Sequence, residues 1–156
     1  MKSLGPLALV VAAAVHGGSA DAAGPAPVSA ARATAPAPTA AADGYVRHLA
    51  ALINEYRQRH GLAPLEPADE LAALAGEHSH AMAAQRRLSH EGFRDRLLRA
   101  GSRVCVENVG QGYRTAEALL EGWRQSPAHH VNLLADDVAR MGIAASARYV
   151  TFFACR

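Results

Sequence analysis

The chain has 156 residues, which suits one domain with its own hydrophobic core, and half of its residues are hydrophobic. Much of that hydrophobic share is alanine within the first 43 positions, so the residues that could build a core come after this segment. The formal net charge is only +2, which excludes the strongly basic surface that binding to nucleic acid requires.

The first residues have the three parts of a secretory signal peptide. Lys2 supplies a positive charge, the apolar run Leu7–Val15 follows it, and the triplet ADA at 20–22 fits a cleavage site. Nine apolar residues are too few to cross a bilayer core of about 30 Å, and no cysteine follows them to carry a lipid anchor. We therefore expect residues 1–22 to be a signal peptide and the mature protein to be secreted, extracellular or periplasmic, without a transmembrane anchor. A disordered alanine-rich tail is the alternative.

Residues 23–43 are rich in alanine, proline, serine and threonine, a composition typical of a linker that cannot form a core. The domain is therefore expected at 44–156. Its first helix is predicted from about Asp43, a suitable N-cap, to Gly61. Apolar residues at helical spacing give this helix one buried face. They are Val46, Leu49, Ile53 and Tyr56.

The second helix is predicted to hold Pro67 in its first turn and to end near Arg87. Asp69 and Glu70 would then lie near the positive end of the helix dipole, where carboxylates are stabilising. The spacing of the apolar residues predicts one buried stripe, in which His78 is a core residue rather than a ligand. The members of the stripe are Leu71, Leu74, Ala75, His78 and Met82.

The rest of the chain alternates short helices with strands. Spacing and cap residues predict three further helices. They are a helix over Phe93–Ala100, a helix capped by Thr115 and a helix from Pro127 to Asn132. The predicted strands are Arg103–Val109, Val138–Ala145 and Arg148–Cys155. Both faces of the last strand are largely apolar, so we expect a small sheet with helices on both sides.

The two cysteines, Cys105 and Cys155, are interpretable once export is assumed. In an oxidising compartment such a pair forms a disulfide, and two buried free thiols are the alternative. Closing this 50-residue loop would stabilise the fold by about 4 kcal/mol on the chain-entropy model. If the strand Arg103–Val109 is extended, Cys105 and Glu107 point to one face. A bridge would then brace the strand that presents Glu107.

Several short motifs follow one another along the domain. They are Ala75 with His78-Ser79 and Met82-Ala83, then Ser89-His90, then Glu107-Asn108-Val109, then the run from Trp123 to Leu134. In this order they resemble the bacterial branch of the CAP superfamily, or SCP domain, which includes cysteine-rich secretory, venom antigen-five and plant pathogenesis-related proteins. The resemblance covers about Tyr45 to Phe153. It implies an α+β fold, a three-layer α-β-α sandwich with a small antiparallel sheet between helices.

The resemblance also implies a central cleft that carries two histidines and two acidic residues. Here Ser126 stands at the position of the second acid, as it commonly does in bacterial members. Two asparagines are expected to tie backbone near the cleft. The residues that match the cleft or lie beside it are His90, Glu107, Ser126, His129, Asn108 and Asn132.

Two neutral imidazoles can bind a divalent metal, so His90 and His129 could hold zinc while Glu107 completes or orients the set. The sequence does not require a metal, because these residues lie far apart and no H-E-x-x-H motif is present. From spacing alone each histidine would be a hydrogen-bonded structural residue, and Glu107 could be structural as well. We therefore expect that the protein requires no cofactor, and that the cleft could in addition bind a divalent metal such as zinc.

The resemblance implies an extracellular binding module, acting as a monomer, for a small ligand, a lipid or a protein partner. Lipid binding would need an exposed apolar groove beside the helices. The alternative is a secreted hydrolase of peptides or cell-wall material, which would use Ser126, His129 and Glu107 or a metal-bound water. Binding is favoured, because no G-x-S-x-G motif is present and the nucleophile and base would lie one turn apart on one helix. A stable scaffold with an occluded cleft is a third interpretation.

Overall fold

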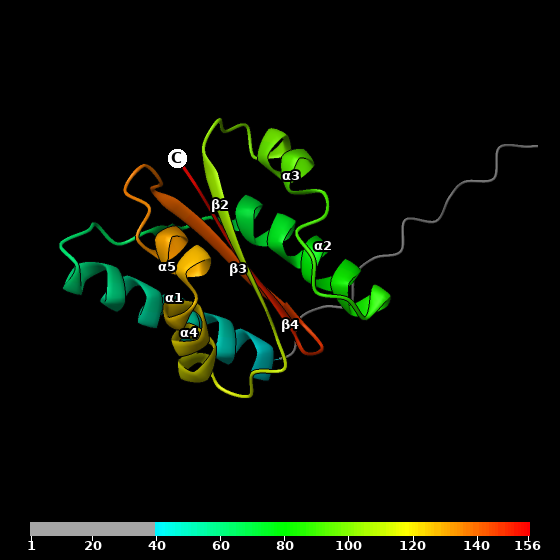
Figure 1. Ribbon diagram of the computed structural model, residues 1–156. Coiled ribbons are helices and arrows are strands. Elements are labelled where there is room, and N and C mark those ends of the chain that lie inside the picture. Colours follow the sequence, from blue (N-terminus) through cyan, green and yellow to red (C-terminus); the bar gives the residue numbers. More distant parts are fainter. Residues whose placement is uncertain (1–39) are drawn as a thin grey trace, which may run out of the picture. The chain divides into compact units, whose positions relative to one another are not determined.

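The computed structural model describes residues 40–156. The predicted signal peptide and nearly all of the predicted linker therefore lie outside the described residues. The described part contains five helices and four strands (Figure 1). They are α1 (Ala40–Arg59), β1 (Glu66–Pro67), α2 (Asp69–Gln85), α3 (Phe93–Arg99), β2 (Cys105–Gln111), α4 (Ala116–Gln125), α5 (Pro127–Leu133), β3 (Arg140–Ser146) and β4 (Tyr149–Cys155). None of the helices in this part is long and apolar enough to span a membrane.

The four strands form one sheet in the order β1-β3-β4-β2. Strands β2 and β3 pair antiparallel with the central strand β4, and β1 runs parallel to β3. Helix α2 packs on one face of the sheet, and α1, α4 and α5 pack together on the other (Figure 1). The predicted α+β sandwich is thus confirmed, with one parallel edge strand added to the antiparallel sheet. The sequence did not predict β1, since two residues carry no periodicity.

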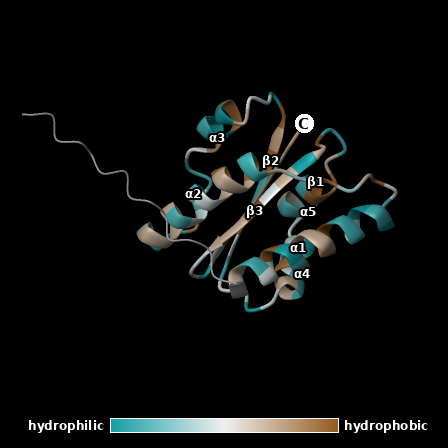
Figure 2. Cartoon of the chain, turned by 180° about the vertical axis from the view of Figure 1, so that it is seen from behind, coloured by the Kyte–Doolittle hydropathy of each residue, from teal (hydrophilic) through white to brown (hydrophobic). Residues whose placement is uncertain are grey.

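The central strand β4 is buried along its whole length because helices cover both faces of the sheet. On one face Phe152 packs in a cluster with Leu49 of α1 and Trp123 of α4. On the other face Phe153 packs with Leu71 of α2. Figure 2 shows the strands β2 and β3 mostly pale to brown, whereas α1 carries broad hydrophilic bands. The core therefore consists of two apolar layers that share one sheet.

Helix α2 approaches β3 closely at Gly142. A Cβ atom on Gly142 would lie 2.0 Å from the backbone nitrogen of Ala72 and 2.1 Å from the carbonyl carbon of Leu71. Only glycine allows the backbones of a helix and a strand to come so near each other. This contact fixes the distance of α2 from the sheet.

Helix α2 carries the predicted buried stripe, and all five of the predicted residues are buried. Its start was predicted wrongly, because Ala68 is the N-cap and Pro67 lies in β1, outside the first turn. The N–H of Glu66 donates to the carbonyl of Ala139 at 2.9 Å. The N–H of Ala68 donates to the carbonyl of Met141 at 2.8 Å. Pro67 lies between these two donors, and its nitrogen faces away from β3. The lack of an N–H at Pro67 therefore costs no hydrogen bond of the sheet.

The other elements begin and end within three residues of their predicted limits. Helix α1 begins at Ala40, three residues before the predicted N-cap. Thr115 caps α4 as predicted, its hydroxyl accepting the N–H of Ala118 at 3.2 Å. Strand β2 begins two residues later than predicted, because the Ser102 hydroxyl bonds both backbone groups of Val104 and holds a turn there.

Candidate functional site

The disulfide between Cys105 and Cys155 fixes the first residue of β2. The two cysteines are direct partners in the β2–β4 register, and their sulfur atoms are 2.08 Å apart. The predicted bridge is therefore present. Because side chains alternate along a strand, Glu107 extends from the same face of β2 as Cys105, two residues further on.

The carboxylate of Glu107 is buried and paired with Arg96 of α3. The Nε and Nη2 atoms of Arg96 donate to its two oxygens at 2.8 and 2.9 Å. Nη1 of Arg96 donates to the carbonyl of Glu91 at 2.9 Å. Both side chains are almost fully buried, with exposed fractions of 7% and 1%. A bidentate, charge-assisted pair of this kind holds the carboxylate ionised and fixed in orientation.

No sequence motif pointed to Arg96 as a site residue. A signal was nevertheless present, because Phe93, Arg96, Leu97 and Ala100 recur at the spacing of one helical face. The three other members of this face are partly buried apolar residues. An arginine in the middle of an apolar stripe needs a buried acceptor, and the carboxylate of Glu107 is that acceptor.

Two histidines contact the same carboxylate. Nδ1 of His90 lies 2.9 Å from Oε1 of Glu107, and because the carboxylate only accepts, Nδ1 carries the proton. In the neutral ring the lone pair is then on Nε2, and the side chain is 53% exposed. His78 is buried beneath, where its Nε2 donates to the carbonyl of Ser89 at 2.7 Å and lies 3.7 Å from Oε1 of Glu107. Burial lowers the pKa of His78.

A cleft of about 310 Å³ opens along β2, between α3 and α5. His90 and His129 both line it. Burial lowers the pKa of His129, and the neighbouring His90 lowers it further, which favours the neutral imidazole. The other residues that line the cleft are Phe93, Cys105, Val106, Glu107, Ala128 and Asn132. The cleft thus combines two imidazoles with a mostly apolar wall.

The two asparagines join α5 to β2 below the cleft. The amide of Asn108 donates to the backbone carbonyl of His129 at 3.0 Å. The amide of Asn132 donates to Oδ1 of Asn108 at 2.9 Å and to the backbone carbonyl of Glu107 at 3.0 Å. Asn108 is fully buried, so these bonds form inside the protein and set the position of His129 relative to β2.

Ser126 is not among the residues that line the cleft. It is the N-cap residue of α5, and its carbonyl accepts the N–H of His130 at 2.8 Å. No hydrogen bond joins the Ser126 hydroxyl to His129 among the described residues, and the Glu107 carboxylate bonds His90 instead of His129. The structure therefore brings His90, Glu107, His129 and Asn132 to one cleft, with Asn108 beneath it and Ser126 outside it.

Within residues 40–156, no group of three or more histidine, cysteine or acidic side chains is arranged to hold a metal ion. The cleft supplies two imidazoles, His90 and His129. The oxygens of Glu107 already accept three hydrogen bonds, two from Arg96 and one from His90, so in this structure the carboxylate orients His90. A cation in this cleft would have two protein ligands and would take its remaining ligands from solution.

The sequence model of the Cysteine-rich secretory protein family (CAP) matches residues 50–155. The uncharacterized membrane protein YlbC of Bacillus subtilis (strain 168) is 32% identical over 107 residues, which are 64% of this chain and 31% of that protein. An extracellular protein containing a SCP domain from Bacillus anthracis str. Ames aligns with a TM-score of 0.69 and 27% identity. That alignment covers 73% of this chain and 41% of the other.

Two more distant structures share the fold. A cysteine-rich secretory protein from Staphylococcus aureus has a TM-score of 0.69 at 22% identity, over 76% of this chain and 40% of the other. An outer surface protein from Borrelia burgdorferi has a TM-score of 0.67 at 19% identity, over 72% of this chain and 92% of the other. The chain thus spans less than half of the relatives from Bacillus and Staphylococcus and nearly all of the Borrelia protein. Because the family match covers most of the described residues and includes the cleft, the chain belongs to the Cysteine-rich secretory protein family (CAP).

Proposed function

We propose that this domain acts outside the cytoplasm as a binding module whose cleft takes up a divalent cation together with a small ligand. The observation that carries the proposal is the hydrogen bond from His90 Nδ1 to the buried carboxylate of Glu107. It leaves the lone pair of His90 Nε2 available beside His129, whose pKa is lowered. Two oriented imidazoles are suited to borderline cations such as Zn²⁺.

Hydrogen bonds with neighbouring residues hold both histidines in position for binding a cation. A histidine that binds a metal commonly donates its second N–H to a carboxylate, which fixes the ring and raises its basicity. Glu107 supplies that carboxylate, and Arg96 holds it in place. Asn108 and Asn132 secure the backbone of His129. Two protein ligands would leave coordination positions for water or for an oxygen of the bound ligand.

A location outside the cytoplasm is supported by the disulfide, which persists in oxidising compartments and is rare elsewhere. Two of the proteins similar in fold are described as extracellular or as an outer surface protein. The apolar wall of the cleft, which includes Phe93 and Val106, favours a ligand with an apolar part.

The test is calorimetric titration of untagged, chelator-treated protein with ZnCl₂. We expect one ion per chain for the unaltered protein, and loss of that binding in the variants His90→Ala and His129→Ala. His48→Ala is the matched control, because His48 is exposed on α1, where it pairs with Glu117. Equal binding by all four proteins would overturn the proposed role of the cleft.

A second titration tests whether the Glu107 carboxylate strengthens zinc binding by His90. Glu107→Gln should weaken zinc binding by about 10- to 100-fold, as is typical for loss of a carboxylate behind a ligating histidine.

The hydrolase alternative has less support, because Ser126 lies outside the cleft and Glu107 bonds His90. Ser126→Ala should accordingly bind zinc as the unaltered protein does.

A further inference from the structure

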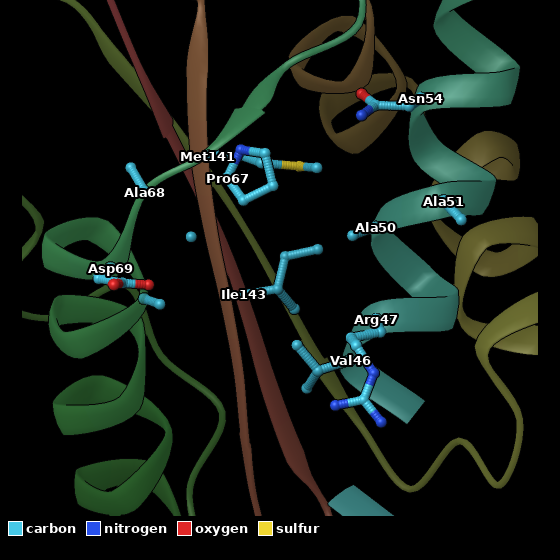
Figure 3. Close-up of a pocket in the computed structure, with 12 residues that line it drawn as sticks. Val46, Arg47, Ala50, Ala51, Asn54, Pro67, Ala68, Asp69, Met141 and Ile143 are labelled. Atoms are coloured by element: carbon cyan, nitrogen blue, oxygen red, sulfur yellow. The ribbon is translucent and has the colours of Figure 1, made fainter. Parts of the chain in front are cut away.

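A groove of about 440 Å³ lies between α1 and α2, beside the outer edge of β3 (Figure 3). Alanines contribute much of its wall, among them Ala50, Ala51 and Ala72. Met141 and Ile143 of β3 lie between the two helical walls. The small side chains leave room for another segment of chain next to β3. This groove is at the opposite edge of the sheet from the histidine cleft.

The outer edge of β3 carries backbone groups that have no partner among residues 40–156. Strand β1 pairs only with Arg140 and Met141. Successive residues of a strand direct their N–H and C=O groups to opposite sides, and Met141 directs its carbonyl away from β4, toward Ala68. By this alternation Ile143 and Ala145 direct theirs to the same outer edge. Among residues 40–156, none forms a backbone hydrogen bond with Ile143 or Ala145 on that side.

At the other edge of the sheet, side chains bond two outward carbonyls. On β2, the amide of Asn132 donates to the carbonyl of Glu107 at 3.0 Å. The indole N–H of Trp123 donates to the carbonyl of Val109 at 3.0 Å. Side chains thus bond these two outward carbonyls of β2, whereas the outward groups of Ile143 have no such partner within the described part of the chain. An open strand edge is a template to which another extended chain can add.

Two charged side chains lie on opposite walls of the groove. Arg47 extends from α1 and Asp69 from α2 (Figure 3). Neither forms an ion pair with another residue in the described part of the chain. Along the direction of β3, Arg47 comes after Asp69 (Figure 3). A strand added parallel to β3, as β1 is, would bring its C-terminal end to Arg47, whereas an antiparallel strand would bring it toward Asp69.

We propose that this groove binds an extended peptide of a partner protein, which adds to the sheet as a strand parallel to β3 and in line with β1. Main-chain bonds to Ile143 and Ala145 would hold the peptide. An acidic side chain or a free carboxylate at its C-terminal end would pair with Arg47. The opposite charge of Asp69 selects this direction over the reverse one.

The first test uses a phage library of random heptapeptides displayed with free C-termini. We expect selection on the unaltered protein to enrich peptides that end in an acidic residue or depend on the terminal carboxylate. Enriched peptides are then synthesised with a fluorescent label, and their Kd is measured by anisotropy. Failure to enrich any peptide would overturn the proposal.

Variants of the open edge give the decisive comparison. Ala145→Pro removes an N–H that no described residue uses, and it should weaken peptide binding by about tenfold or more. Ala145→Ser keeps the N–H and should bind as the unaltered protein does. Arg47→Glu leaves the sheet untouched and should also weaken binding by about tenfold or more, with Arg47→Lys nearly unchanged. Unchanged binding in Arg47→Glu or in a folded Ala145→Pro variant would overturn the proposal.

Amide hydrogen exchange locates the bound peptide. Exchange at Ile143 and Ala145 should slow when peptide is added, and protection confined to other residues would overturn the proposal. A concentration-dependent dimer that Ala145→Pro abolishes would assign the edge to a second copy of the chain and would likewise overturn it. His90→Ala should bind peptide normally, and Ala145→Pro should bind zinc normally, so each site can fail without the other.

Discussion

The pair formed by Arg96 and Glu107 is the strongest electrostatic constraint at the cleft. Both charges are almost completely removed from water, which carries a large desolvation cost that their two direct bonds offset. Removing one partner leaves the other charge buried without compensation. Glu107 therefore contributes to the site only while Arg96 is present.

We predict that Arg96→Gln lowers the free energy of unfolding by about 3–5 kcal/mol, the usual cost of breaking a buried ion pair. The loss arises because the Glu107 carboxylate stays buried next to His90. Urea unfolding followed by circular dichroism measures the change. Arg94→Gln on the same helix is the matched control, because Arg94 is exposed and should change stability little.

Replacing both partners completes that comparison. Arg96→Met combined with Glu107→Leu should recover much of the stability, since no charge is then left unpaired. If Arg96→Gln proves as stable as Arg94→Gln, the pair does not contribute to folding as we describe. The double variant should nevertheless bind zinc more weakly than the unaltered protein, because it lacks the carboxylate that orients His90.

Among the elements, β2 carries the most functional positions, and the disulfide holds it to β4 at one end. The bridge closes a loop of 50 residues that contains α4, α5, β3 and nearly all of β4. The same strand presents Glu107 to α3 and Asn108 to α5. A constraint on β2 therefore reaches both walls of the cleft.

Replacing both cysteines with serine should destabilise the domain by about 4 kcal/mol on the chain-entropy model for a loop of this length. The comparison is the midpoint of urea unfolding for the double variant against the unaltered, oxidised protein. The unaltered protein treated with reductant serves as the control and should unfold at the same urea concentration as the variant. A loss below about 1 kcal/mol would mean that the β2–β4 hydrogen bonds alone hold the strand.

The elements that the sequence predicted well are those with a long periodic pattern. The buried stripe of α2 and the cap of α4 by Thr115 are local features, and both were predicted correctly. Strand β1 was missed, because it is defined only by its contact with β3, which is distant in the chain. Pro67 was predicted to lie in a helix because its pairing with Met141 of β3 leaves no pattern in the local sequence.

The motif resemblance grouped six residues at one cleft, and the structure places four of them along it. The motif resemblance selected His90, Glu107 and His129 as one cleft, and all three line it. It did not indicate whether Glu107 would be a ligand or a support. That distinction depends on Arg96, whose role requires the tertiary contact between α3 and β2. Spacing along a sequence carries no information about such a contact.

For the whole molecule, the buried histidine His78 makes stability depend on pH. Burial lowers its pKa in the folded state, while in the unfolded chain it titrates near 6.5. The groups that face it are Glu107 of β2, which raises this pKa, and Arg96 of α3 and His90, which lower it. Below the unfolded pKa the unfolded state binds more protons, so stability falls as the pH falls.

We therefore expect the free energy of unfolding to be constant from about pH 7.5 to 7 and to decline below about pH 6.5, by up to about 1.4 kcal/mol per pH unit for each such histidine. Urea unfolding at several pH values, on chelator-treated protein, measures the slope. His78→Gln should reduce this slope and leave the share due to His129, whose pKa burial also lowers, whereas His80→Gln on the same helix should leave the slope unchanged. A slope that persists unchanged in His78→Gln would assign the effect to other groups.

The close approach at Gly142 has a consequence for how rigidly α2 is held on the sheet. With no gap between the backbones of α2 and β3, the helix can neither roll nor slide without carrying the strand along. Asp69 at one end of α2 and His78 near its middle thus belong to a single stiff frame.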